Sequence, residues 1–142
     1  MGRIGLSEPP FFLHPVRMSH LVHEGRCLCG AVRFQASGPA KWTGYCHCDS
    51  CRRHTGAPVA AFAGFEAEMV RFFGEPMSVY ASSSGVQRGF CGTCGSTLTY
   101  AGERWPTEIH FHIGAFERPQ DFPPQGQAFA EERLPWLHLA DG

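Results

Sequence analysis

The stretch Tyr45-Cys46-His47-Cys48-Asp49-Ser50-Cys51 places three cysteines within six residues of the chain. Thiolates spaced this closely are typical zinc ligands, and zinc prefers four nitrogen or sulfur ligands in a tetrahedron. A structural zinc site takes all four ligands from the protein, whereas a catalytic site takes three and leaves the fourth position to water or substrate. This stretch offers three cysteines and no evident fourth ligand. We therefore predict a zinc site with one open position.

The other four cysteines form two pairs, and each pair is followed by glycine: Cys27-Leu28-Cys29-Gly30 and Cys91-Gly92-Thr93-Cys94-Gly95. A metal knuckle turns the backbone so that its amides face the sulfurs, and glycine adopts the required positive φ without steric cost. Two closely spaced pairs indicate a metal site rather than unligated buried thiols. We predict that Cys27, Cys29, Cys91 and Cys94 close one structural four-thiolate zinc site, which ties the first strand to a late hairpin.

The charge of the three-cysteine zinc site determines which fourth ligand it favours. A divalent ion held by Cys46, Cys48 and Cys51 carries a formal charge of −1 before its fourth ligand arrives, which makes it a weak Lewis acid towards water. Thiolates match zinc, and a thiol that coordinates it loses its proton. The open position therefore predicts a thiol substrate, with these three cysteines at the catalytic centre.

Two histidines offer alternatives for the fourth ligand. His54 lies one helical turn after Cys51 and would close a Cys₃His site, because positions i and i+3 share a helix face. His47 is the other candidate, but in an extended Cys-His-Cys segment its ring points away from the neighbouring sulfurs. We expect His47 to order the pocket or to contact solvent.

Charge and N-terminal composition argue against several classes of protein. The formal net charge is −1, and of the 12 basic residues only Arg52 and Arg53 are adjacent. A nucleic-acid binder carries a basic stripe or patch, so we expect no nucleic-acid partner. Residues 9–15 are apolar but too short and too rich in proline for a signal peptide or a membrane span. We expect no membrane association and a cytoplasmic location, where the cysteines stay reduced.

Length and composition indicate a single domain. A chain of 142 residues buries about two-thirds of the surface that its unfolded form exposes. Repeats, linkers and low-complexity blocks are not evident, so we expect one zinc domain over residues 23–142. Residues 1–22 are expected to form a loosely ordered extension, and Met18 is a candidate alternative start.

Short alternating segments predict a mostly β protein. The 17 glycines and 11 prolines favour tight turns over long helices. A short helix is expected after the three-cysteine stretch, capped by Asp49 or Ser50 and ended by Gly56. The spacing of the predicted strands indicates antiparallel sheets. The predicted strands cover residues 32–36, 41–46, 59–63, 68–73, 77–82, 86–90, 97–100 and 108–113.

The sequence pattern also predicts the surroundings of several other side chains. His110 and His112 share one strand face with Glu108, and we expect that face to be polar and exposed, although two imidazoles there could also reach a metal. Arg88 either steadies the charge of a sulfur cluster, pairs with a carboxylate or occupies a surface strand position. The expected core aromatics are Phe62, Phe65, Phe72, Phe73 and Trp136, the last packed on the sheet.

Three motifs in order, together with the tail Glu132-Arg-Leu-Pro-Trp136, resemble the glutathione-dependent formaldehyde-activating enzyme (GFA) and centromere protein V-like domain family. The motifs are Gly25-Arg-Cys-Leu-Cys-Gly-Ala-Val-Arg-Phe34, Cys46-His-Cys-x-x-Cys-Arg-Arg53 and Gly89-Phe-Cys-x-x-Cys-Gly-Ser-x-Leu98. The resemblance covers roughly residues 25–140 and is far more specific than any single motif. It implies an Mss4-like fold of antiparallel sheets with zinc knuckles and one or two short helices. It also implies the same division of the seven cysteines between a structural zinc and a more exposed, labile one.

The resemblance implies a carbon–sulfur lyase that makes S-(hydroxymethyl)glutathione from glutathione and formaldehyde. The substrate-binding candidates are His47, Arg52 and Arg53, and both arginines lie just beyond the ligands, where they could pair with glutathione carboxylates. The expected partner is a small thiol such as glutathione. An alternative remains open in which the chain is a non-catalytic zinc module that carries glutathione or binds a protein partner.

Overall fold

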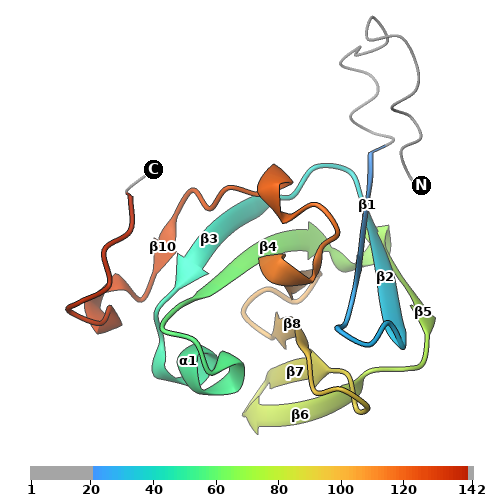
Figure 1. Cartoon of the computed structure of the whole chain (residues 1–142), viewed down its shortest axis with the longest axis horizontal. Coiled ribbons are helices and arrows are strands. Elements are labelled where there is room, and N and C mark those ends of the chain that lie inside the picture. The colour runs from blue at the N-terminus through green and yellow to red at the C-terminus, as the bar shows by residue number, and fades with distance from the viewer. Residues whose placement is uncertain (1–20, 141–142) are drawn as a thin grey trace, which may run out of the picture.

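The computed structural model describes residues 21–140, which form two β-sheets and one α-helix (Figure 1). The smaller sheet has the strand order β1-β2-β5, and the larger one has the order β10-β3-β4-β9-β8-β7-β6. All strand pairs are antiparallel except that of β10 with β3. The prediction of a mostly β fold with antiparallel sheets and a short helix is confirmed. Most of the predicted extension, residues 1–20, lies outside the described residues.

The elements follow one another along the chain with short connections. The strands are β1 (Val22–Arg26), β2 (Val32–Ser37), β3 (Trp42–Cys46), β4 (Ala60–Glu66), β5 (Val70–Gly74), β6 (Ser78–Ser83), β7 (Val86–Phe90), β8 (Thr97–Gly102), β9 (Glu108–His112) and β10 (Gln127–Ala128). The helices are α1 (Asp49–Thr55) and the 3-10 turns η4 (Ala67–Met69), η5 (Ile113–Ala115), η6 (Pro119–Asp121) and η7 (Ala130–Glu132). Within residues 21–140, no helix is long and apolar enough to cross a membrane.

Stacked phenylalanines join the two sheets. Phe34 of β2 and Phe111 of β9 are fully buried, and their rings stack with centroids 4.1 Å apart. Phe116 meets the Phe34 ring edge-on at 5.2 Å. Burying each such side chain contributes about 1.5–3 kcal/mol. Gly25 of β1 leaves room for this packing, because a Cβ there would lie 2.2 Å from the Phe34 ring.

The strand β1 was not predicted, and three aromatic residues are not where the sequence placed them. The polar run around Gly25 shows no strand alternation, yet β1 pairs with β2 along its whole length. Phe72 and Phe73 are 40% and 38% exposed because β5 is an edge strand. Trp136 is 63% exposed, so its predicted packing on the sheet is wrong. It follows η7, where the chain has already left the strands.

Candidate functional site

Four sulfurs gather where two loops meet. Cys27 and Cys29 lie between β1 and β2, while Cys91 and Cys94 lie between β7 and β8. The four sulfurs are within 4.8 Å of one another; the Cys27–Cys29 pair is separated by 3.7 Å and the Cys29–Cys91 pair by 3.8 Å. A tetrahedral zinc with its usual Zn–S bonds places sulfurs about 3.8 Å apart. The residues of this four-cysteine cluster therefore fit a zinc ion.

Backbone amides of both knuckles face these sulfurs. The N–H of Val32 donates to Cys27 Sγ at 3.3 Å, and the N–H groups of Thr93 and Cys94 donate to Cys91 Sγ at 3.3 and 3.4 Å. Gly95 ends the second knuckle with φ +81°, a conformation that favours glycine. Such amides stabilise thiolate ligands and orient them, so the local backbone is arranged for metal-bound sulfur.

The second group, the three-cysteine cluster, forms where β3 passes into α1. The sulfurs of Cys46, Cys48 and Cys51 lie within 4.8 Å of one another. Cys48, rather than Asp49 or Ser50, caps the helix: its Sγ accepts the N–H of Cys51 at 3.3 Å. Cys46 and Cys51 are 8% and 3% exposed, whereas Cys48 is only partly buried. An incoming ligand would therefore approach from the Cys48 side.

No imidazole or carboxylate completes this cluster within the described part of the chain. The group of mutually close ligand atoms contains the three sulfurs and no nitrogen of His47 or His54. The structure thus gives no support to the Cys₃His alternative. An open fourth position is the arrangement of a zinc site that accepts water or substrate.

His47 lies inside the protein, between Cys46 and Cys48, two of the expected metal ligands. The side chain is fully buried, and its Nε2 lies 2.6 Å from Gln127 Oε1 of β10. Its backbone N–H donates to the carbonyl of Ala128 at 3.0 Å. This placement agrees with a role in ordering the site and leaves no surface for direct contact with solvent.

The two arginines after the cluster differ in their contacts. Arg52 donates to the carbonyl oxygens of His47 at 2.5 Å and of Glu132 at 3.1 Å, so it fastens the knuckle to the C-terminal segment. Arg53 is 80% exposed, and its ion pair within residues 21–140 is with Asp49, at 3.0 Å. Of the three substrate-binding candidates, Arg53 alone presents its charge at the surface.

A buried arginine from another strand contacts the three-cysteine cluster. Arg88 of β7 is 4% exposed, and its Nη1 donates to Cys51 Sγ at 3.5 Å. The Cys46 thiol and then Arg88 donate to the Cys51 sulfur, and they lower the pKa of Cys51 to about 6. Of the three positions considered for Arg88, the structure selects contact with a sulfur cluster. This is the three-cysteine cluster, although Cys91 of the four-cysteine cluster is nearer to Arg88 in sequence.

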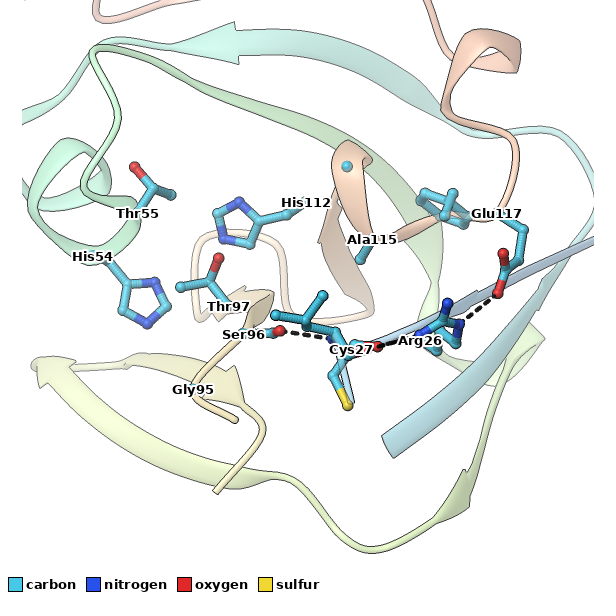
Figure 2. Close-up of a pocket in the computed structure, with 13 residues that line it drawn as sticks. Arg26, Cys27, His54, Thr55, Gly95, Ser96, Thr97, His112, Ala115 and Glu117 are labelled. Carbon is cyan, nitrogen blue, oxygen red and sulfur yellow. Dashed lines mark hydrogen bonds and ion pairs between the residues drawn. The ribbon is translucent and has the colours of Figure 1, made fainter. Parts of the chain in front are cut away.

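A pocket of about 610 Å³ adjoins the helix that carries Cys51 (Figure 2). His54 and Thr55 line it from α1, and they share a helix face with Cys51 through i+3 and i+4 spacing. His112 lines it from β9; its ring lies 6.0 Å from that of His54 and 4.5 Å from Phe62, which packs with the three-cysteine cluster. The cysteine among the lining residues is Cys27 of the four-cysteine cluster, and the three-cysteine cluster connects to the pocket through α1 and through the contact of His112 with Phe62. The remaining lining residues are Arg26, Cys27, Leu28, Gly95, Ser96, Thr97, Gly114, Ala115, Phe116 and Glu117.

The prediction that His110 and His112 form an exposed polar face is wrong. Their side chains are 4% and 7% exposed, because aromatic rings cover this face: Trp42 and Tyr100 pack on His110, and Phe62 packs on His112. His110 bonds Glu108 at 2.8 Å, and Glu108 pairs with Lys41 at 3.0 Å. His112 Nε2 and His54 Nδ1 are buried and have no hydrogen-bond partner among residues 21–140.

We expect His112 to make stability dependent on pH. Burial, together with the charges of His54 and Arg88, lowers the pKa of His112 to about 3, against 6.5 in an unfolded chain. Between these values the unfolded state binds one more proton, so this contribution is complete above pH 6.5 and is lost as pH falls towards 3. At pH 5 the loss is about 2 kcal/mol. Urea denaturation at pH 7 and pH 5 should show a correspondingly smaller loss in His112→Gln, and an equal loss in both proteins would contradict the assignment.

Comparisons with known proteins agree with the sequence motifs. Residues 22–132 match a family described as glutathione-dependent formaldehyde-activating enzyme. An uncharacterized lyase of Schizosaccharomyces pombe is 38% identical over 79 residues, which span 56% of this chain and only 57% of that protein. A Halomonas elongata protein that carries the name of the same family is 30% identical over 125 residues, 82% of this chain and 80% of that one. A Rhodobacter sphaeroides crystal structure shares the fold, with TM-score 0.58 and 23% identity over 74% of this chain and 99% of that one.

Proposed function

Because this chain belongs to the glutathione-dependent formaldehyde-activating enzyme family, we propose that it is a zinc-dependent carbon–sulfur lyase. Its reaction would join a thiol such as glutathione to formaldehyde or a similar small electrophile. The observation that supports this most directly is the three-cysteine cluster, which gathers three sulfurs and no fourth side-chain ligand among the described residues. The seven free cysteines support a reducing compartment such as the cytoplasm.

The proposed chemistry is an addition to a carbonyl group. A metal ion held by the cluster would lower the pKa of an incoming thiol, so that the thiol reacts as its thiolate at neutral pH. The sulfur attacks the aldehyde carbon, a carbon–sulfur bond forms, the carbonyl π bond breaks and the oxygen takes up a proton. The reverse reaction breaks the carbon–sulfur bond and releases the aldehyde.

The protein would hold the thiol from two sides. The pocket beside α1 has the size of a small-molecule site and can take the part of the substrate that carries no sulfur. His54 and His112 line this pocket, and among residues 21–140 their atoms His54 Nδ1 and His112 Nε2 have no hydrogen-bond partner. Arg53, exposed at the outer side of α1, would meet a substrate carboxylate. Arg52 and His47 keep the knuckle in place through their buried contacts.

The test is acceleration of adduct formation. Metal-loaded protein is mixed with glutathione and formaldehyde, and the adduct is followed by NMR against the uncatalysed reaction. Cys48→Ser should reduce the acceleration roughly 100-fold or more, because it removes a metal ligand and even the loss of a residue that orients a ligand costs about 10–100-fold. Serine is a preferred helix N-cap, so this substitution removes the sulfur and keeps the start of α1. Ser50→Ala, exposed on the same helix, is the matched control and should react as wild type.

Two outcomes would count against the proposal. If wild-type protein binds glutathione but does not accelerate the reaction, the chain is a thiol carrier and not an enzyme. If Cys48→Ser accelerates the reaction as well as wild type does, the three-cysteine cluster is not the reacting centre.

A further inference from the structure

The larger sheet carries a buried cation, Arg88, that has no carboxylate partner among residues 21–140. We propose that Arg88 is the counter-charge of the three-cysteine cluster. Its charge makes the cluster prefer an anionic thiolate to a neutral molecule as the fourth ligand. This inference rests on the proposed function, since it names the residue that sets the ligand preference of the same site.

The contacts of Arg88 fix its guanidinium against the cluster. Nη1 reaches Cys51 Sγ at 3.5 Å, Nε donates to Ser82 Oγ at 3.0 Å, and the guanidinium carbon lies 5.2 Å from the centre of the Tyr100 ring. Among residues 21–140, no Asp or Glu carboxylate lies within 4.0 Å of it. Arginine keeps its proton in proteins, and a buried charge without compensation is strongly unfavourable. The sulfurs are therefore the groups that must balance this cation.

Charge balance then restricts the state of the cluster. Three neutral thiols leave Arg88 uncompensated, and three bare thiolates carry a charge of −3 in a buried place. Without a metal, one thiolate at Cys51 beside two neutral thiols carries −1. Three thiolates around a divalent ion carry −1, which Arg88 balances. His54 and His112 stand nearby, and burial, together with the charge of Arg88, lowers the pKa of each, so both are neutral at pH 7. A thiolate as fourth ligand brings the cluster to −2, and the guanidinium lowers the cost of that added charge, whereas a neutral ligand adds no charge for it to stabilise.

The four-cysteine cluster provides an internal comparison. Its fourth sulfur is already supplied by the chain, and Cys29 is exposed while Cys94 is partly exposed, so water screens its charge. Arg26, the nearby cation, is about half exposed and donates to the carbonyls of Cys27 and Leu28 rather than to a sulfur. A buried arginine on a sulfur is thus a feature of the cluster with the open position.

The test compares one charged and one neutral ligand in Arg88→Met, Arg88→Lys and wild type. Each protein is loaded with cobalt and titrated separately with glutathione and with imidazole, and binding is followed by the cobalt absorption bands. Arg88→Met should bind glutathione roughly 10–100-fold more weakly, as is usual when a partner of a metal ligand is lost. Its affinity for imidazole should stay within about twofold of wild type. Arg88→Lys keeps the charge but not the separate guanidinium donors, so it should recover part of the glutathione affinity.

Two results would overturn this role. Equal weakening for glutathione and imidazole in Arg88→Met would make Arg88 a merely structural residue, and unchanged glutathione affinity would remove its role altogether. If Arg88→Met does not fold, Ser82→Ala loosens the guanidinium and should weaken glutathione binding alone by about two- to tenfold. Unchanged glutathione binding in Ser82→Ala would also overturn the inference. Because only binding is measured, absence of catalysis in wild type would refute the enzyme proposal and leave this test intact.

Discussion

Replacing Cys94 with serine is expected to abolish the folded state. The four-cysteine cluster joins the β1–β2 loop of one sheet to the β7–β8 loop of the other. Binding of a structural zinc contributes on the order of 10 kcal/mol in small zinc domains, which is comparable with the whole stability of a typical domain. Circular dichroism and thermal denaturation of the purified variant should show loss of the β signal or of a cooperative transition.

The same result is expected for Cys27→Ser and for wild type treated with a strong chelator. Leu28→Ser is the matched control: the residue lies in the same knuckle, its side chain is 81% exposed, and the variant should melt like wild type. A Cys94→Ser protein that melts within a few degrees of wild type would show that this cluster does not stabilise the fold.

Replacing Cys46 with serine should leave the protein folded but remove the metal from the three-cysteine cluster. Cys46 ends β3 at the border of a small buried group and does not join the two sheets. Its loss should cost about 1–3 kcal/mol, the usual cost of a poorly satisfied buried polar group. Metal analysis should show that about one of the two zinc ions is lost, and binding of glutathione to the metal should disappear.

The comparison between the two variants tests whether the four-cysteine cluster stabilises the fold while the three-cysteine cluster binds the ligand. Equal loss of melting temperature in Cys46→Ser and Cys94→Ser would contradict it. Full retention of both metals in Cys46→Ser would contradict the placement of the second metal.

Much of the site could be predicted because its determinants are local. A knuckle is set by two cysteines a few residues apart and a glycine that accepts positive φ, and the structure brings together all seven sulfurs in the groups that this spacing indicated. The helix after Cys48 and its end at Gly56 depend on neighbouring residues in the same way.

The remaining features depend on which strands become neighbours. His112 alternates like an exposed residue, but Phe62 and His54 of α1 pack beside its ring on that face of the sheet. Arg88 and Cys51 are 37 residues apart, and no local pattern indicates that they meet. The strand β1 has too few apolar residues to be recognised, and its pairing with β2 is what defines it. These are the contacts that hold the candidate site in place, and they exist only in the folded sheet.

The central claim is that one cluster is saturated by four cysteines while the other leaves a position for a thiol. X-ray absorption at the zinc edge, with the metal content measured in the same sample, tests it most directly. We predict two zinc ions per chain. We also predict that the mean coordination rises from about 3.5 to about 4 sulfurs per zinc when glutathione is added. A single zinc per chain, or a protein nitrogen or oxygen ligand that glutathione does not displace, would contradict the claim.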